Sequence, residues 1–139
     1  RSDCAVLEPM LAPLRAIDGI RAVRDATRGG VTAILHEFAD ASQCGMNIEE
    51  QKLPLKTAVR GVCELLGLEA LNFANEGKVV IVTAPEAEAT VLAALRNSPL
   101  GQDACTIGQV TEAKQVKVQG IFGATRLLDL PYNEPLPRI

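Results

Sequence analysis

The segment at residues 79–82 constrains the fold most, because it consists of four consecutive β-branched residues. Such residues have restricted side-chain rotation and favour a pleated strand over a helix. A continuous apolar segment of this kind predicts a strand that is buried on both faces, or nearly so. Gly77 and Lys78 precede it and Pro85 follows it, so we expect a turn before the strand and the start of a helix after it.

Helices and strands alternate along the rest of the chain. Apolar residues at helical spacing predict helices at about residues 7–17, 31–42, 55–66 and 85–96. Strands are predicted at residues 20–24, 46–53, 105–110, 116–119 and 121–130. This order predicts an α+β fold, a two-layer sandwich in which helices cover a mixed or antiparallel sheet. We expect residues 1–130 to form a single domain and the proline-rich residues 131–139 to form an extended tail.

Charge and composition argue against several classes of function. The 14 basic and 17 acidic residues give a net charge of −3 and are interspersed, whereas a nucleic-acid binder needs a basic surface. Three phenylalanines and one tyrosine are too few and too scattered to stack on bases. No apolar stretch is long enough for a transmembrane helix. We therefore expect neither a nucleic acid nor a membrane as a partner.

The cysteines and the single histidine do not form a metal-site pattern. The cysteines are Cys4, Cys44, Cys63 and Cys105. Because no two of them have the close spacing of zinc ligands, we expect no metal ligands in this chain. Sparse cysteines without a signal peptide predict reduced thiols in a cytoplasmic protein, where they serve as small core residues rather than nucleophiles. Thr32 and Asp40 lie one helical turn from His36, which predicts a solvated histidine.

A first candidate site lies at residues 25–30, between a predicted strand and a predicted helix. Thr27 is placed to cap that helix with its hydroxyl. Gly29 and Gly30 remove side chains from the first turn, which opens backbone N–H groups and the positive helix end to an anion. Arg28 adds a guanidinium suited to phosphate oxygens. A plain tight corner, in which Arg28 forms a salt bridge with Asp25, is the alternative that the sequence leaves open.

A second candidate site is the corner formed by Asn75, Glu76 and Gly77, just before the predicted buried strand. Gly77 permits an unusual backbone conformation there. A carboxylate held at the end of a strand can act as a base or orient a substrate amide, which makes Glu76 a candidate for catalysis. The alternative is an ordinary polar turn with Glu76 in solvent.

Five sequence segments occur in one order that resembles a known family. They are RDATRGGV at 24–31, CELLGLEAL at 63–71, ANEGKVV at 74–80, IGQV at 107–110 and LPRI at 136–139. Together they closely resemble the C-terminal half of the HypE family of hydrogenase maturation factors. That family lies in the superfamily of aminoimidazole ribonucleotide synthetase, selenophosphate synthetase and thiamine-monophosphate kinase. The first segment is shared by several branches, whereas its combination with the third and the last is specific to the HypE family.

The resemblance implies an α+β domain that packs against an N-terminal domain. That domain carries most of the site for ATP and Mg²⁺ and is absent from this chain, which begins without Met and is expected to be a fragment. The implied activity is an ATP-dependent carbamoyl dehydration, which converts an S-carboxamide on the enzyme's own C-terminal cysteine to the thiocyanate that supplies the cyanide ligands of nickel–iron hydrogenase. Glu76 is the implied catalytic residue. The implied cofactor-binding residues are Asp25, Thr27, Arg28, Gly29, Gly30 and Asn75.

Partners and alternatives also follow from the resemblance. It implies the carbamoyl-transferring factor HypF, a HypC–HypD complex that accepts the cyanide, and a homodimer of the full-length protein. The family ends in Pro-Arg-Ile-Cys, whereas this chain stops at Ile139, so we expect the isolated fragment to be inactive. One alternative is another ATP-using enzyme of the superfamily, of the thiamine-monophosphate kinase or selenophosphate synthetase type. The other is a non-catalytic protein-interaction module.

Overall fold

The computed structural model of the chain describes residues 4–130. The chain forms two compact units, one built from residues 1–27 and 75–105 and the other from residues 28–74 and 106–139. It passes from one unit to the other after Thr27, after Ala74 and after Cys105. Each unit has its own core, and a single domain over residues 1–130 stays a prediction. The predicted extended tail, residues 131–139, lies outside the described residues.

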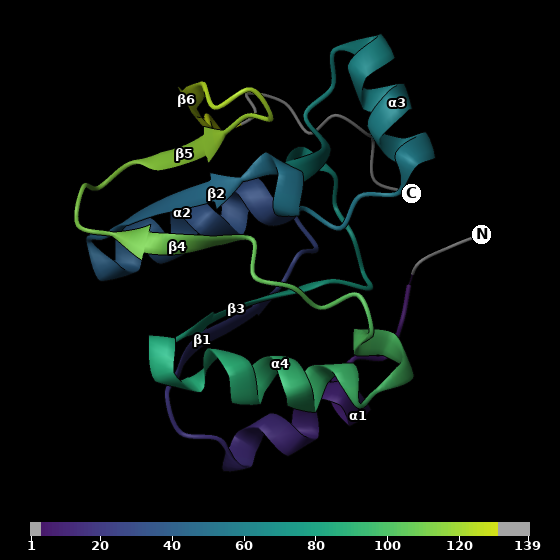
Figure 1. Cartoon of the computed structure of the whole chain (residues 1–139), viewed down its shortest axis with the longest axis vertical. Helices are drawn as coiled ribbons and strands as arrows, with labels where there is room; N and C mark the ends of the chain where they lie inside the picture. Colours follow the sequence, from purple (N-terminus) through teal and green to yellow (C-terminus); the bar gives the residue numbers. More distant parts are fainter. Residues whose placement is uncertain (1–3, 131–139) are drawn as a thin grey trace. The chain divides into compact units, whose positions relative to one another are not determined.

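The first unit contains a two-stranded antiparallel sheet and several short helices (Figure 1). Its elements are α1 (Glu8–Leu11), η1 (Ala12–Ala16), β1 (Ile20–Asp25), β3 (Val79–Thr83), η4 (Pro85–Ala87), α4 (Glu88–Arg96) and η5 (Pro99–Gly101), where η marks a 3₁₀ helix. Val23 of β1 lies opposite Ile81 of β3. Among the described strands only β1 pairs with β3, and all five residues of β3 are half-buried. The predicted strand is confirmed, and its residues are half-buried on both faces rather than fully buried.

Helices of the first unit pack on its sheet and form its core. The buried core residues are Met10, Leu14, Ala87, Val91 and Leu95. Val79 and Ile81 pack against this core, because alternate residues of a strand point to the same face. The predicted helix over residues 7–17 is instead a single α turn followed by η1. Pro9 and Pro13 explain the difference, because proline lacks the N–H group that a continuous α-helix needs.

The second unit contains a four-stranded mixed sheet. Its elements are α2 (Gly30–Ser42), β2 (Gly45–Glu49), η2 (Glu50–Lys52), α3 (Thr57–Leu66), η3 (Ala70–Asn72), β4 (Gly108–Thr111), β5 (Val116–Gln119) and β6 (Thr125–Leu127). The strand order is β4-β2-β5-β6, with β2 and β5 parallel and the other two pairs antiparallel. A mixed sheet and an antiparallel sheet with accompanying helices confirm the predicted α+β class.

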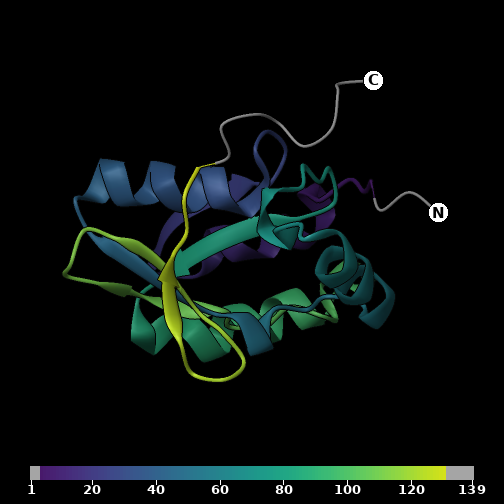
Figure 2. The same ribbon diagram turned by 90° about the horizontal axis from the view of Figure 1, so that it is seen from above.

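α2 covers one face of this mixed sheet, as Figures 1 and 2 show from two directions. Met46 and Ile48 of β2 lie beside Val116 and Val118 of β5, and all four are buried. Leu35 of α2 belongs to the same buried core, and Val31 and Phe38 pack against it. The predicted apolar stripe of this helix is therefore confirmed. In both views α3 stands apart from α2.

Three predicted strands are shorter in the structure. β2 ends at Glu49 and η2 follows it, and β4 begins only at Gly108. The predicted strand over residues 121–130 contains a turn, in which Gly123 has φ +84° and donates its N–H to the carbonyl of Gly120. Only β6 remains extended there. No helix within residues 4–130 is both long and apolar enough to cross a membrane.

Candidate functional site

The structure brings residues 25–27 of the first predicted site next to the second predicted site, where β1 ends and β3 begins. Asp25 pairs with Val79 in the sheet. Just beyond that pair the N–H of Ala26 donates to the carbonyl of Lys78 at 3.0 Å. The N–H of Asn75 in turn donates to the carbonyl of Ala26 at 2.7 Å. Residues 25–27 and 75–78 are far apart in sequence, yet these two hydrogen bonds join them into one site.

Asn75 holds the turn that presents Glu76. Its side-chain Oδ1 accepts a hydrogen bond from the N–H of Gly77 at 2.9 Å, which is the arrangement of an Asx turn. Glu76 follows Asn75 directly and is exposed to solvent. Gly77 does not have a positive φ, so the predicted unusual backbone at this glycine is wrong. The side chain of Asn75, rather than the freedom of a glycine, shapes this corner.

The start of α2 differs from the prediction in which Thr27 caps the helix. α2 begins at Gly30, and its N-cap is Gly29, which has a left-handed conformation and no side chain. The prediction for Thr27 is wrong because the helix starts three residues further along the chain. The N–H groups of Gly30, Val31 and Thr32 donate to no other group within residues 4–130. Unpaired N–H groups at a helix start can accept an anion.

Gly30 packs directly against the backbone of residues 71–73, at the end of η3. A Cβ atom at Gly30 would lie 2.4 Å from the carbonyl oxygen of Leu71 and 2.7 Å from that of Phe73. Thr32 is fully buried, and its hydroxyl donates to Oδ1 of Asn72 at 2.6 Å. These contacts hold the first turn of α2 against residues 71–73. The sequence analysis missed this role of Thr32 and Asn72, although a threonine in the first turn of an apolar helix was a signal for it.

Arg28 follows Thr27, the last residue of this part of the first unit, and precedes Gly29, the N-cap of α2. Its side chain is exposed and forms no ion pair within the described part of the chain. The alternative in which Arg28 bridges Asp25 therefore has no support. The described residues also hold no group of three or more His, Cys, Asp or Glu side chains that could bind a metal ion.

The four cysteines are thiols, and they differ in burial. Cys63 is buried, Cys44 and Cys105 are half-buried, and Cys4 is exposed, so the prediction of core cysteines is wrong for Cys4. Burial raises the pKa of the Cys105 thiol above its ordinary value of 9.0, although the charge of Arg96 opposes this and Asp103 adds to it. A raised pKa disfavours the thiolate, which is the nucleophilic form.

His36 is not solvated, contrary to the prediction. The residue is half-buried, and its Nε2 donates to the carbonyl of Leu128 at 2.7 Å. The sequence could not indicate this partner, because Leu128 lies far along the chain and meets α2 only through the fold of the second unit. The bond links α2 to the segment that follows β6.

Comparison with known proteins gives consistent matches along most of the chain. The family described as "AIR synthase related protein, C-terminal domain" matches residues 2–121. Carbamoyl dehydratase HypE from Escherichia coli is 61% identical over 138 residues, which cover 99% of this chain and 41% of that protein. The crystal structure of E. coli HypE has a TM-score of 0.94 to this chain. The chain thus spans about two-fifths of the length of the curated relatives that it matches.

Two further solved structures are similar over most of the chain. A hydrogenase maturation protein HypE in complex with ATP has a TM-score of 0.89 at 35% identity, covering 96% of this chain and 43% of that one. A HypE–HypF complex contains a chain with a TM-score of 0.89 at 38% identity, covering 94% of this chain and 43% of that one. The chain is therefore similar to several solved structures of proteins named HypE.

Proposed function

This chain belongs to the AIR synthase related protein family, whose C-terminal domain it represents, and we propose that it forms part of an ATP-dependent carbamoyl dehydratase of the HypE type. The observation that carries the proposal is the joining of residues 25–27 to residues 75–78 by two backbone hydrogen bonds. This joins the phosphate-facing turn that the resemblance implies to the turn that presents Glu76. The relatives named carbamoyl dehydratase support the same activity.

The residues at the start of α2 fit a phosphate group. Gly30 packs so closely against the carbonyls of Leu71 and Phe73 that a side chain is excluded there, and the remaining contact with a ligand would come from backbone N–H groups. The first N–H groups of α2 are open, and Arg28 offers an exposed guanidinium. We propose that Arg28, Gly29 and Gly30 face the ATP phosphates, and that Asp25, Thr27 and Asn75 complete the site. The complex of a similar HypE with ATP supports the use of ATP by a protein of this type.

Glu76 is the proposed proton acceptor. ATP, when bound, supplies the phosphoryl group that turns the oxygen of a carboxamide into a leaving group. The nitrogen loses one of its two protons when the O-phosphorylated imidate forms, and it loses the second when the carbon–nitrogen triple bond forms and the carbon–oxygen bond breaks with departure of phosphate. A carboxylate within hydrogen-bond reach of that nitrogen can take the proton. The Asx turn of Asn75 fixes the backbone beside Glu76 and so limits the positions from which its carboxylate can act.

The remaining parts of the reaction lie outside the described residues. We propose that the carboxamide is carried on a cysteine that follows the Pro-Arg-Ile sequence at 137–139, and that the Mg²⁺ ligands lie in the N-terminal domain of the longer protein. HypF is the proposed carbamoyl donor, supported by the structure of a HypE–HypF complex. A HypC–HypD complex as cyanide acceptor and a homodimer are proposed on the family resemblance alone.

The test uses the full-length protein that contains this chain, after carbamoylation by HypF. Its intact mass is measured with ATP and Mg²⁺ and, in parallel, without ATP. We expect the protein to lose the mass of one water molecule only when ATP is present, because the carboxamide becomes a nitrile. Transfer of a phosphoryl group to a small molecule without this mass loss would favour a kinase of the same superfamily. No ATP turnover and no mass loss would favour an interaction module.

A further inference from the structure

The mixed sheet of the second unit carries a pocket on the face opposite to α2. Met46 and Ile48 of β2 are buried in the core beneath α2, so Asn47 between them points to the other face of the sheet. Lys117 alternates with two buried valines of β5 in the same way. Asn47 and Lys117 both line a pocket of about 300 Å³. This volume lies at the lower end of the range for small-molecule sites.

The turn between β4 and β5 forms one wall of this pocket. Gly45 has no room for a side chain, because a Cβ atom there would overlap the carbonyl oxygen of Ala113 in that turn. The hydroxyl of Thr111 donates to the same carbonyl at 3.4 Å, and the carbonyl of Gln115 accepts the N–H of Met46 at 3.0 Å. Contacts with both neighbouring strands therefore hold the wall in place.

The side chain of Asn47 contains a buried oxygen without a partner. Its Oδ1 accepts no hydrogen bond from any group within residues 4–130. Buried side-chain oxygens nearly always have a partner, because an unpaired one has given up its hydrogen bonds to water. Asn47 lines the pocket, so a molecule bound there can supply the missing donor. The oxygen therefore indicates a ligand with an N–H or O–H group.

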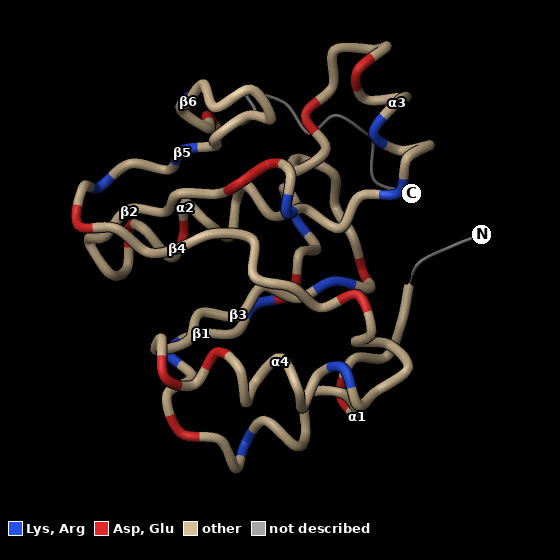
Figure 3. The backbone as a smooth tube through the Cα atoms, in the orientation of Figure 1, with Lys and Arg blue, Asp and Glu red and all other residues tan. Residues whose placement is uncertain are grey.

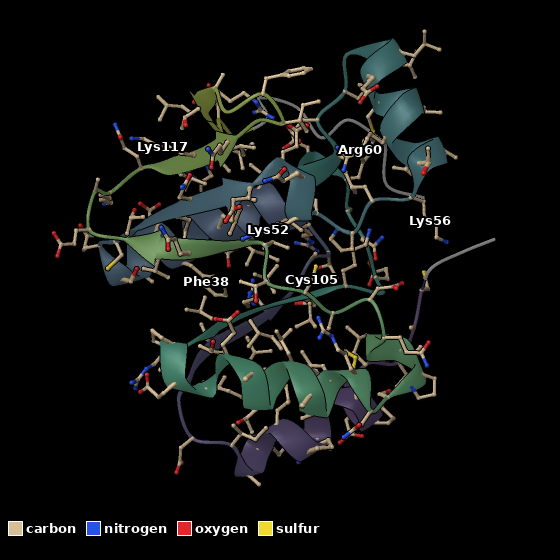
Figure 4. All side chains as sticks on the ribbon, in the orientation of Figure 1. Phe38, Lys52, Lys56, Arg60, Cys105 and Lys117 are labelled. Atoms are coloured by element: carbon tan, nitrogen blue, oxygen red, sulfur yellow. The ribbon has the colours of Figure 1, made fainter. Side chains whose placement is uncertain are left out.

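Lys117 adds a positive charge beside this oxygen. It is the register partner of Asn47 in the parallel pair of β2 and β5, and neighbouring strands lie about 4.8 Å apart. Figures 3 and 4 show this lysine on β5. Among the described residues that line the pocket Lys117 alone is charged, and it forms no ion pair with any of residues 4–130. Glu49, on the same strand as Asn47, is paired with Lys52 at 2.7 Å. Lys117 is thus available to an anionic group of a ligand.

We propose that this pocket binds a small carboxylic acid that carries an amide N–H on the carbon next to its carboxylate, as an N-acylated amino acid does. The N–H donates to Oδ1 of Asn47, and the carboxylate accepts from Lys117 and from the hydroxyl of Thr125, which also lines the pocket. Two ligand groups on one carbon match two side chains on adjacent strands. One negative charge on the ligand balances the single lysine.

The inference is separate from the proposed dehydratase. None of the residues that line this pocket belongs to the proposed site around Glu76, and the binding requires neither ATP nor a carbamoyl group. Its test can therefore fail while the dehydratase assignment stands, and the reverse also holds.

Two probes that differ only at the amide nitrogen test the assignment. N-acetylglycine has the N–H, whereas N-acetylsarcosine has a methyl group in its place. The Kd of each is measured on the ¹⁵N-labelled 139-residue chain from the backbone amide signals of β2 and β5. We expect N-acetylglycine to shift these signals and to bind roughly tenfold more tightly, because its analogue leaves a buried acceptor unpaired. Both probes act on the unaltered chain, so this comparison does not depend on the folding of any variant.

Substitutions then assign the two contacts. Asn47→Leu removes the oxygen at similar size, so the difference between the two probes should disappear. Lys117→Gln should weaken both probes roughly tenfold and leave the ratio of their Kd values unchanged, because it removes only the charge. Lys56→Gln is the matched control, since Lys56 is an exposed lysine of the same unit that does not line the pocket. It should bind both probes as the wild type does.

Three results would overturn the proposal. No change in the β2 and β5 signals at millimolar N-acetylglycine would show that water alone satisfies Oδ1 of Asn47. Equal Kd values for the two probes, or equally tight binding of acetate, would show that the pocket takes an anion without using this oxygen. Acetyl-triglycine should bind no more tightly than N-acetylglycine, because the pocket pairs one carboxylate and one N–H. Much tighter binding of the longer probe would identify the end of a polypeptide, rather than a small molecule, as the ligand.

Discussion

Burial raises the pKa of the Cys105 thiol, and this property separates it from a cysteine suited to nucleophilic chemistry. A reactive cysteine needs an environment that stabilises the thiolate, such as a nearby cation that outweighs desolvation. Arg96 acts in that direction at Cys105, but desolvation is the larger effect. The thiol is therefore a poor substitute for the C-terminal cysteine on which the proposed reaction takes place.

The first prediction concerns the pH dependence of Cys105. Its folded-state pKa lies above the unfolded value, so the unfolded chain loses this proton first as pH rises. The contribution of Cys105 to stability is thus complete below pH 9 and declines above it. Urea unfolding of the wild-type chain and of Cys105→Ala at a series of pH values should show a decline above pH 9 that is smaller in the variant. An identical decline in the two proteins would contradict the assignment.

The second prediction concerns Arg28, whose guanidinium is exposed and forms no ion pair within the described residues. Arg28→Ala in the full-length protein should raise the KM for ATP by roughly tenfold or more, since a hydrogen bond to a charged group contributes about 1.5–3 kcal/mol. The thermal stability should stay within about 0.5 kcal/mol of the wild type, because an exposed side chain without partners contributes little.

Arg21→Ala provides the matched control, because Arg21 is an exposed arginine of β1. Its KM for ATP should equal that of the wild type. If Arg28→Ala and Arg21→Ala gave the same KM, Arg28 would not face the phosphates. If Arg28→Ala instead lowered stability and activity together, its role would be structural.

At the scale of single elements, the start of α2 depends on two glycines for different reasons. Gly29 and Gly30 both have positive φ, a conformation that costs other residues energy. At Gly30 the neighbouring backbone also leaves no room for a side chain. At Gly29 the tight contact of a Cβ would be with the Cβ of Ala33, within the same helix. Gly30 therefore couples the helix to residues 71–73, whereas Gly29 only shapes the turn.

The third prediction compares two glycine-to-alanine substitutions in the second unit. Gly30→Ala should lower the free energy of unfolding by about 1–3 kcal/mol, because it combines a positive φ with a clash against the Leu71 carbonyl. Gly61→Ala lies in α3, where a Cβ meets nothing within 4 Å. It should stabilise the chain by about 0.5–1 kcal/mol through helix propensity. Chemical denaturation of both variants measures these values, and a neutral Gly30→Ala would contradict the close packing.

Periodicity in the sequence was sufficient to predict most elements, and it failed where tertiary contacts decide. The apolar stripe of α2 and the alternation in β5 follow from residue spacing alone. The half-buried state of β3 does not, because burial depends on how many strands pair with it. Gly123 delays the start of the last predicted strand, because its positive φ produces a turn before β6 that a glycine in an apolar segment signals only weakly.

The candidate site was predicted in pieces rather than as a whole. The residue types in 25–30 and 75–77 indicated anion binding and a carboxylate. Their proximity depends on the hydrogen bonds of Ala26 to both Lys78 and Asn75, which no local pattern reveals. The bond between Thr32 and Asn72 and the bond of His36 to Leu128 were missed for the same reason. Both join residues whose contact is set by the fold.

At the scale of the whole molecule, the comparison of lengths limits what the chain is proposed to do. The chain spans about two-fifths of its curated relatives, and the proposed phosphate-facing turn is covalently continuous with both units, since the chain crosses between them after Thr27. Asn75, at another crossing, leads directly to Glu76.

The central claim is that Glu76 accepts the proton that the nitrogen loses as the nitrile forms, and it is tested by single-turnover dehydration in the full-length carbamoylated protein. Rapid mixing with ATP and Mg²⁺ followed by intact-mass analysis gives the rate at which one water is lost. Glu76→Gln keeps the size of the side chain but removes the base, and should slow this step roughly 100-fold or more. Glu86→Gln, at another exposed glutamate of the first unit, should react at the wild-type rate. A Glu76→Gln protein that forms thiocyanate as fast as the Glu86→Gln control would contradict the account.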